Sequence, residues 1–163
     1  MSAIEELAAR AGAALMAAGS MLATAESCTG GWVAQALTSV PGASQWFDRG
    51  FVCYSNASKR ELLGVSARTL ARAGAVSEAV AHEMALGALA RSRAQVALAV
   101  TGIAGPSGGS PRKPVGTVCL AWAMRERAAR SETQRYGGER EEVRRQAVER
   151  ALAGLIELLQ AAR

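Results

Sequence analysis

The sequence predicts an α/β protein, a three-layer α/β/α sandwich with a mixed, mostly parallel sheet. Segments with the period of amphipathic helices alternate along the chain with short apolar runs. The run at 96–100 is continuously apolar, which is typical of a strand buried on both faces. The last two apolar runs are separated only by a charged turn, as in a hairpin. Alternating helices and strands of this kind place helices on both faces of one sheet.

The predicted helices are recognised by apolar residues at helical spacing and by capping residues at their starts. Ser2 and Glu5 form a capping box before the first helix, and Ser77 caps the fifth. Gly19, Gly74 and the Pro41-Gly42 pair stop the chain from continuing as helix. In chain order, the expected helices cover residues 2–19, 32–40, 56–64, 66–73, 77–88 and 143–159.

The predicted strands are short apolar or β-favouring runs, and the first three lead directly into polar or glycine-rich turns. Ligands of such sheets bind beyond the carboxyl ends of parallel strands. We therefore expect the turns at 26–31, 55–59 and 101–110 to meet at one edge of the sheet. In chain order, the expected strands cover residues 21–25, 50–54, 96–100, 117–124 and 129–136.

Length and composition predict one domain over residues 1–163. A chain of 163 residues can bury a core without metal or disulfides. Apolar residues make up 50% and aromatic residues 4%, so the core is built mainly from Ala, Val and Leu. Cys28, Cys53 and Cys119 lie far apart and form no C-x-x-C pair, which indicates reduced thiols rather than disulfides or a zinc site.

Charge and hydropathy favour a cytoplasmic protein with a small anionic ligand. The N-terminus is acidic where a signal peptide is basic, and the apolar stretch at 11–25 is short, so we expect neither export nor membrane insertion. The net charge of +5 arises from 19 Lys+Arg against 14 Asp+Glu. No basic run is interleaved with aromatic residues, so nucleic acid is a less favoured partner than a small anion.

Lysine is the best candidate for a catalytic base. His82, the only histidine, lies within a predicted helix and is interpreted as structural, and arginine stays protonated. Lys59 and Lys113 are the only lysines. A lysine becomes a base when burial or a nearby cation lowers its pKa. Lys59 follows a predicted strand closely, near Tyr54, whereas Lys113 lies in a proline-rich loop and is interpreted as an exposed charge.

The turn TAESCTGG at 24–31 presents Ser27, Cys28 and Thr29 in front of two glycines. It is either the site of a nucleophile or a turn that holds a ligand. Glycine-rich turns expose backbone N–H groups to phosphate or ribose, but neither this turn nor 101–110 matches a standard nucleotide motif. Histidine and cysteine are not clustered at metal-binding spacing, so no metal is expected.

Several stretches together resemble the nicotinamide-nucleotide amidases, or nicotinamide mononucleotide deamidases, which share the C-terminal domain of the competence/damage-inducible protein CinA. The stretches are TAESCTGGW (24–32), PGASQWFDRGFVCYSNASK (41–59), TGIAGPSGGSPRKPVGTV (101–118) and GGEREEVRRQA (137–147). The resemblance covers essentially the whole chain. It implies conversion of nicotinamide mononucleotide and water to nicotinic acid mononucleotide and ammonia, in pyridine-nucleotide salvage. It also implies a homodimer that needs no metal or other cofactor.

The resemblance further implies a serine–lysine mechanism. Ser44, in the P-G-x-S turn, matches the nucleophile, Lys59 matches the base, and Tyr54 matches a tyrosine that supports the pair. Ser27 stays an alternative nucleophile, and Cys28 is a weaker one. The expected substrate-binding residues, with the last suited to the phosphate, are Ser27, Thr29, Gly30, Thr101, Gly102, Gly105 and Arg140.

Two positions depart from the family pattern, and two other functions stay open. Ala43 stands where a second serine is common, and Ser107 where an acidic residue is common. Ala43 removes a possible hydrogen-bond partner, which is expected to weaken activity without abolishing it. The alternatives are a non-catalytic nucleotide-binding or partner-docking module and an amidase for another carboxamide. Retention of Ser44, Tyr54 and Lys59 together favours the enzyme.

Overall fold

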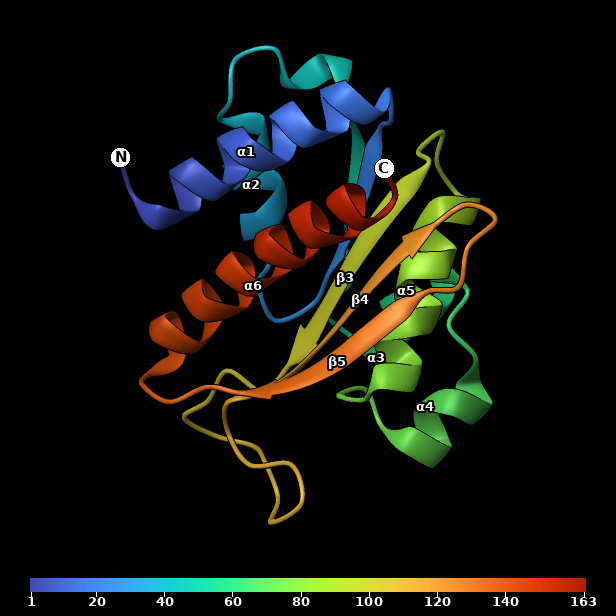
Figure 1. Ribbon diagram of the computed structural model, residues 1–163. Coiled ribbons are helices and arrows are strands. Elements are labelled where there is room, and N and C mark those ends of the chain that lie inside the picture. Colours follow the sequence, from blue (N-terminus) through green and yellow to red (C-terminus); the bar gives the residue numbers. More distant parts are fainter.

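The computed structural model describes all 163 residues and has one five-stranded sheet with the strand order β2-β1-β3-β4-β5 (Figure 1). Strand β1 pairs in parallel with β2 and β3, whereas β4 runs antiparallel to both of its neighbours. All strands except β4 therefore point the same way. The bounds are β1 Leu22–Glu26, β2 Phe47–Val52, β3 Val96–Gly102, β4 Thr117–Met124 and β5 Arg130–Arg135.

Two layers of helices cover the sheet, which confirms the predicted α/β sandwich with a mixed sheet (Figure 1). One layer holds α1 (Ala3–Ala18), α2 (Trp32–Thr38) and α6 (Arg140–Ala161). The other holds α3 (Asn56–Leu63), α4 (Ala67–Ala73) and α5 (Glu78–Ala90). Because side chains alternate along a strand, each layer packs on every second residue of β1, β3 and β4.

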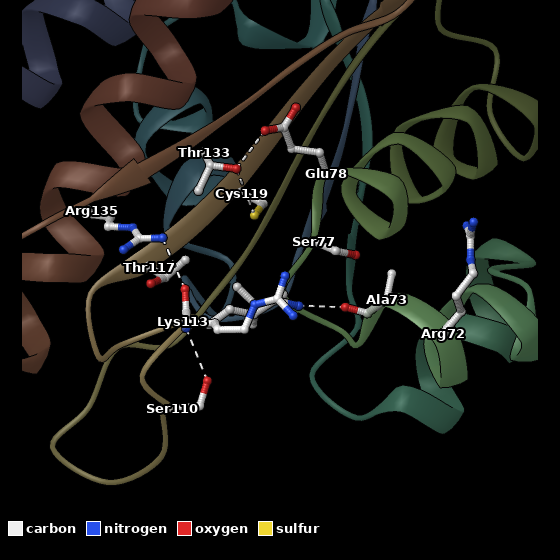
Figure 2. A pocket seen from close by; sticks show the side chains of 12 residues that line it. Arg72, Ala73, Ser77, Glu78, Ser110, Lys113, Thr117, Cys119, Thr133 and Arg135 are labelled. Atoms are coloured by element: carbon white, nitrogen blue, oxygen red, sulfur yellow. Dashed lines mark hydrogen bonds between the residues drawn. The ribbon is translucent and has the colours of Figure 1, made fainter.

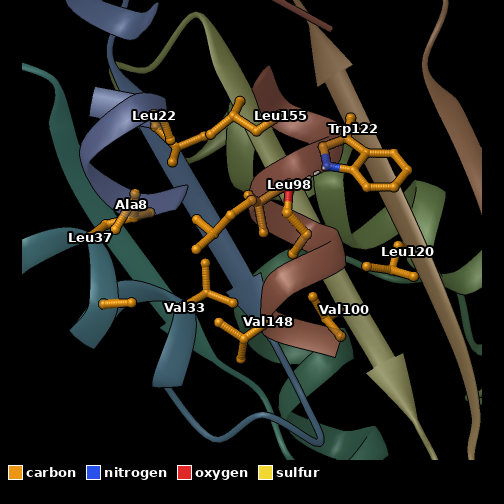
Figure 3. Packing of buried hydrophobic residues seen from close by; sticks show 14 of the residues in the cluster. Ala8, Leu22, Val33, Leu37, Leu98, Val100, Leu120, Trp122, Val148 and Leu155 are labelled. Atoms are coloured by element: carbon orange, nitrogen blue, oxygen red, sulfur yellow. Dashed lines mark hydrogen bonds between the residues drawn. The ribbon is translucent and has the colours of Figure 1, made fainter. Parts of the chain in front are cut away.

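Small residues let the helices approach the sheet closely, which explains a core with few aromatic residues. Figure 3 shows Trp122 of β4 beside α6, and its Nε1 donates to the carbonyl of Ala151 at 2.9 Å. A Cβ at Gly154 would lie 2.1 Å from the Trp122 ring, so α6 can lie here only with a glycine at this position. On the opposite face, α5 packs on alanines such as Ala97 and Ala121.

The structure contains every predicted helix and strand, and the largest differences from the prediction lie around β2. A short 3₁₀ helix, η1 (Ala43–Gln45), precedes β2 and was not expected from the sequence. Strand β2 covers Phe47–Val52 rather than the expected 50–54, because its pairing with β1 runs from Phe47, opposite Leu22, to Val52. Charged Asp48 and Arg49 are tolerated there since β2 is an edge strand. No helix has both the length and the apolar character needed to cross a membrane.

Candidate active site

The turns that follow β1, β2 and β3 meet at the carboxyl edge of these strands, as the sequence pattern predicts. Between them lies a cavity of about 170 Å³. Its remaining walls come from two places, the segment that joins α4 to α5 and the first residue of α6. The lining residues are Ser27, Cys28, Tyr54, Asn56, Lys59, Ala75, Val76, Thr101, Gly102, Ala104 and Arg140.

Ser27 and Lys59 form the one close pair of nucleophile and base in this cavity. The Nζ atom of Lys59 lies 3.0 Å from Ser27 Oγ and also donates to the carbonyl of Tyr54 at 3.1 Å. Ser27 is the first residue after β1, and Lys59 lies one turn into α3, whose N-cap is Ser55. The parallel pairing of β1 with β2 brings the ends of these two strands together.

Burial of Lys59 makes it suited to act as a base. Its side chain is only 1% exposed, and none of the ion pairs in the protein involves it. Loss of hydration disfavours the ammonium, so the pKa of Lys59 lies below its ordinary value of 10.5, although the thiols of Cys53 and Cys28 oppose the shift. A neutral Lys59 can accept the Ser27 hydroxyl proton and still donate an N–H to Tyr54.

Two charged side chains outside the cavity hold the turn that carries Ser27. Buried Glu26 accepts hydrogen bonds from Thr29 Oγ1 at 2.6 Å and from two backbone N–H groups in the first turn of α2 at 2.8 and 3.0 Å. Arg144 of α6 donates to the carbonyls of Cys28 at 3.0 Å and Thr29 at 3.2 Å. Its guanidinium also lies over the Trp32 ring. Ser27 is thereby held on a rigid turn.

Cys28 faces the same cavity but is a poor nucleophile. Burial raises the pKa of its thiol to about 11, with Arg144 opposing the shift. The thiolate is the reactive form of cysteine, so this thiol is largely unreactive at neutral pH.

Arg140 and Tyr54 form the rim of the cavity. Arg140 donates to the Tyr54 hydroxyl at 3.1 Å and to the carbonyl of Gly105 at 2.8 Å. Tyr54 is 63% exposed, so this rim is in contact with solvent. Deeper in the cavity, Thr101 donates to the carbonyl of Ala75 at 3.0 Å and thereby fixes the wall between α4 and α5.

Most of the residues expected at the site lie around this cavity, but not all of them. Thr29 is fully buried and directs its hydroxyl to Glu26, and Gly30 adopts a left-handed turn conformation behind Ser27. Gly105 contributes only its carbonyl, to Arg140. His82 lies half-buried on α5, away from the lining. The expected residues that do line the cavity are Ser27, Tyr54, Lys59, Thr101, Gly102 and Arg140.

The expected pairing of Ser44 with Lys59 is wrong. Ser44 lies in η1, before β2 begins, whereas Lys59 lies in α3, after β2 ends. Strand β2 has six residues, which separate the two ends by about 20 Å. Ser44 is exposed at the opposite edge of the sheet and does not line the cavity. Ser27, the alternative nucleophile, is the serine beside Lys59.

Glu26, Asn56 and Arg144 belong to the site and were missed in the sequence. Glu26 carried a usable signal, because a carboxylate between a buried strand and a helix start can bind the free N–H groups of that helix. Asn56 lines the cavity at the start of α3. Arg144 donates to the carbonyl of Cys28, which lies 116 residues earlier in the sequence. No local sequence pattern predicts such a contact.

Replacing Glu26 by glutamine is expected to lower the stability of the protein. In the variant, a side-chain NH2 group would replace one carboxylate oxygen, so a buried N–H donor would lose its acceptor. A buried donor without an acceptor lowers the free energy of unfolding by about 1–3 kcal/mol. Urea unfolding of Glu26→Gln should show this loss, with exposed Glu61→Gln as the matched control. Equal stability of the two variants would contradict the role of Glu26 in holding the turn.

No three or more His, Cys, Asp or Glu side chains are grouped so that they could hold a metal ion.

Residues 4–159 match the protein family described as the CinA C-terminal domain. The chain is 56% identical to the nicotinamide-nucleotide amidohydrolase PncC of Enterobacter agglomerans over 144 residues, which cover 88% of each chain. It is 50% identical to the protein of the same name from Escherichia coli K12, over 94% of this chain and 93% of that one. The crystal structure of a competence/damage inducible protein from Agrobacterium tumefaciens has a TM-score of 0.94 and 52% identity, covering 97% and 96% of the two chains.

Proposed function

Because the chain belongs to the CinA C-terminal domain family, we propose that it is a nicotinamide-nucleotide amidohydrolase. It converts nicotinamide mononucleotide and water to nicotinic acid mononucleotide and ammonia, which is a pyridine-nucleotide salvage reaction. The names of its curated relatives support the substrate. The observation that supports the chemistry is the 3.0 Å contact between Ser27 Oγ and the buried Lys59 amine.

Ser27 is the proposed nucleophile and Lys59 the proposed base. Neutral Lys59 takes the hydroxyl proton while Ser27 Oγ attacks the carboxamide carbon. The proton then passes to the departing nitrogen, so that the C–N bond breaks and ammonia leaves an acyl ester on Ser27. Water opens this ester, giving its proton to Lys59, which returns it to Ser27 Oγ. The positive pyridinium ring withdraws electrons and makes the carboxamide carbon more electrophilic.

The backbone N–H of Cys28 is a suitable donor to the oxyanion. It follows the nucleophile directly and donates to no other backbone group. The N–H of Ser27 itself is engaged by the carbonyl of Val100 at 2.9 Å. A preorganised donor at the developing oxyanion contributes strongly to such acyl transfers.

The cavity around Lys59 suits the nicotinamide group, and the remainder of the mononucleotide extends past Arg140. A neighbouring hollow of about 720 Å³ shares Ala104 and Arg140 with this cavity. The guanidinium of Arg140 keeps N–H groups available beyond its bonds to Tyr54 and Gly105, and its planar fork matches a phosphate.

The reaction is tested by ammonia release from nicotinamide mononucleotide, with free nicotinamide and NAD as comparison substrates. We expect turnover of the mononucleotide and far less of the other two. A folded wild-type protein that releases no ammonia from the mononucleotide would contradict the proposed function and favour a non-catalytic module.

Arg140→Gln is expected to raise KM for nicotinamide mononucleotide about tenfold or more with a smaller change in kcat, because it removes a charged phosphate contact. Nicotinamide riboside, which lacks the phosphate, is the matched substrate, and its kcat/KM should change little. Arg127→Gln, in an exposed turn, is the control variant. An equal loss with both substrates would show that Arg140 acts through Tyr54 rather than on the phosphate.

A further inference from the structure

The face of the sheet that α5 covers carries a second cavity, which is larger than the cavity around Lys59 and separate from the hollow beside Arg140. Its volume is about 650 Å³, and it is bounded by the end of α4, the start of α5, the loop at 103–116 and strands β4 and β5 (Figure 2). It shares only Val76 with the cavity around Lys59. Neither the proposed reaction nor the family names assign a function to it.

Four cationic side chains from separate segments line this second cavity. Arg72 comes from α4, Arg112 and Lys113 from the loop, and Arg135 from β5. In Figure 2, Arg135 and Arg72 lie on opposite sides with Lys113 between them. None of the four forms an ion pair with a carboxylate. Like charges repel at such a site, and a bound anion would offset that repulsion.

The only acidic residue of the lining does not neutralise these cations. The carboxylate of Glu78 accepts hydrogen bonds from Ser131 Oγ at 2.8 Å and Thr133 Oγ1 at 2.7 Å. Figure 2 shows Glu78 directed at Thr133, at the end of the cavity away from Lys113. The charge of the lining, four cations against one carboxylate, is therefore strongly positive.

Lys113 is not the freely exposed charge that its loop position indicated. It is half-buried, and its Nζ donates to the carbonyl of Ala73 at 2.6 Å, so the loop is attached to the end of α4. Its backbone N–H donates to Ser110 Oγ at 3.1 Å, which leaves the Ser110 hydroxyl hydrogen free for a ligand. Arg135 donates to the carbonyl of Arg112 at 3.1 Å and retains its other N–H groups.

We propose that this second cavity binds a small molecule carrying phosphoryl groups with more than one negative charge. Three arginine forks and an ammonium offer donors in several directions, which suits the many oxygens of such a group. A volume of about 650 Å³ lies within the range of ligand pockets. A nucleic acid fits less well, because the cations line a hollow and no aromatic side chain lies among them. The proposal stands independently of the amidohydrolase reaction.

Calorimetric titration with inorganic pyrophosphate tests the site. Arg112→Gln/Arg135→Gln is expected to weaken binding about 100-fold, because each lost charged donor costs about tenfold in affinity. The matched control is Arg127→Gln/Arg163→Gln, which removes two exposed arginines elsewhere and should change affinity less than about twofold. Arg72→Gln is a second test variant, since Arg72 is exposed and its side chain takes part in no ion pair. About tenfold weaker binding is expected.

A further variant separates this site from the mouth of the proposed active site. Arg140→Gln removes the phosphate contact proposed for the active site, so pyrophosphate binding that this variant retains does not depend on that contact. The variant should retain the binding event that Arg112→Gln/Arg135→Gln weakens about 100-fold. Loss of binding in Arg140→Gln together with normal binding in Arg112→Gln/Arg135→Gln would overturn the proposal, and so would the absence of pyrophosphate binding to the wild type. Tight binding of a single-stranded oligonucleotide without binding of pyrophosphate would overturn it in favour of a nucleic-acid surface. Because ammonia release is not measured, none of these outcomes depends on the proposed reaction.

Discussion

Ser27→Ala is expected to abolish ammonia release from nicotinamide mononucleotide, whereas Ser44→Ala should retain nearly all of it. Removing a nucleophile that acts together with a base lowers kcat about 10³-fold or more. Ser27 Oγ lies 3.0 Å from Lys59 Nζ, while Ser44 lies beyond the far end of β2. The exposed position of Ser44 also means that its truncation leaves no cavity in the core.

The two serine variants serve as controls for each other, and their folding can be compared by thermal unfolding. Intact-protein mass spectrometry during turnover gives a second measurement, because an acyl ester on Ser27 adds the mass of the acyl group. This adduct should be absent from Ser27→Ala and present in Ser44→Ala. Loss of turnover in Ser44→Ala with normal turnover in Ser27→Ala would contradict the assignment of Ser27 as nucleophile.

Lys59→Met is expected to lower turnover about 10³-fold or more while the protein stays folded, because methionine has similar length and no proton to exchange. Arg60→Met, on the same helix but exposed, is the matched control and should retain full activity. In the wild type, kcat/KM should rise with pH as Lys59 loses its proton. The midpoint should lie below 10.5, since burial lowers the pKa of this amine. Normal turnover in Lys59→Met would contradict its role as base.

The same lowered pKa predicts a pH-dependent effect on stability. The folded state releases the Lys59 proton at a lower pH than the unfolded state does. Below the folded-state pKa, the buried charge opposes folding in full, and this penalty decreases as the pH rises towards the pKa of the unfolded chain. Lys59→Met should therefore unfold at a higher urea concentration than the wild type at neutral pH. The difference should shrink as the solution becomes more alkaline, and a difference that is constant with pH would contradict this explanation.

The order and type of the elements were predictable because their signals are local. The capping box at Ser2 and the period of the first helix depend on residues within a few turns of one another, and the structure contains that box. The meeting of three turns at one edge was also predictable, because parallel strands place their carboxyl ends together. Lys59 stood out in the sequence because all basic residues except Lys59 and Lys113 are arginine.

The choice between two serines was not predictable from the residues near them. Ser44 and Lys59 are 15 positions apart (59 − 44), and Ser27 and Lys59 are 32 apart, yet the shorter separation spans the full length of β2. Arg144 of α6 holds the turn that carries Ser27, and Arg72 and Arg135 line opposite sides of one cavity. Both arrangements bring together segments that are distant in the sequence.

The sequence by itself determined the α/β alternation, the edge of the sheet where the candidate site lies and the lysine proposed as the base. Periodicity, turn residues and the scarcity of lysine are properties of the chain. Only the tertiary structure decided that Ser27 lies against Lys59, that burial lowers the pKa of this lysine, and that four cations line a second cavity. Strand pairing brings residues together without regard to their separation in sequence, and burial depends on what the rest of the chain packs around them.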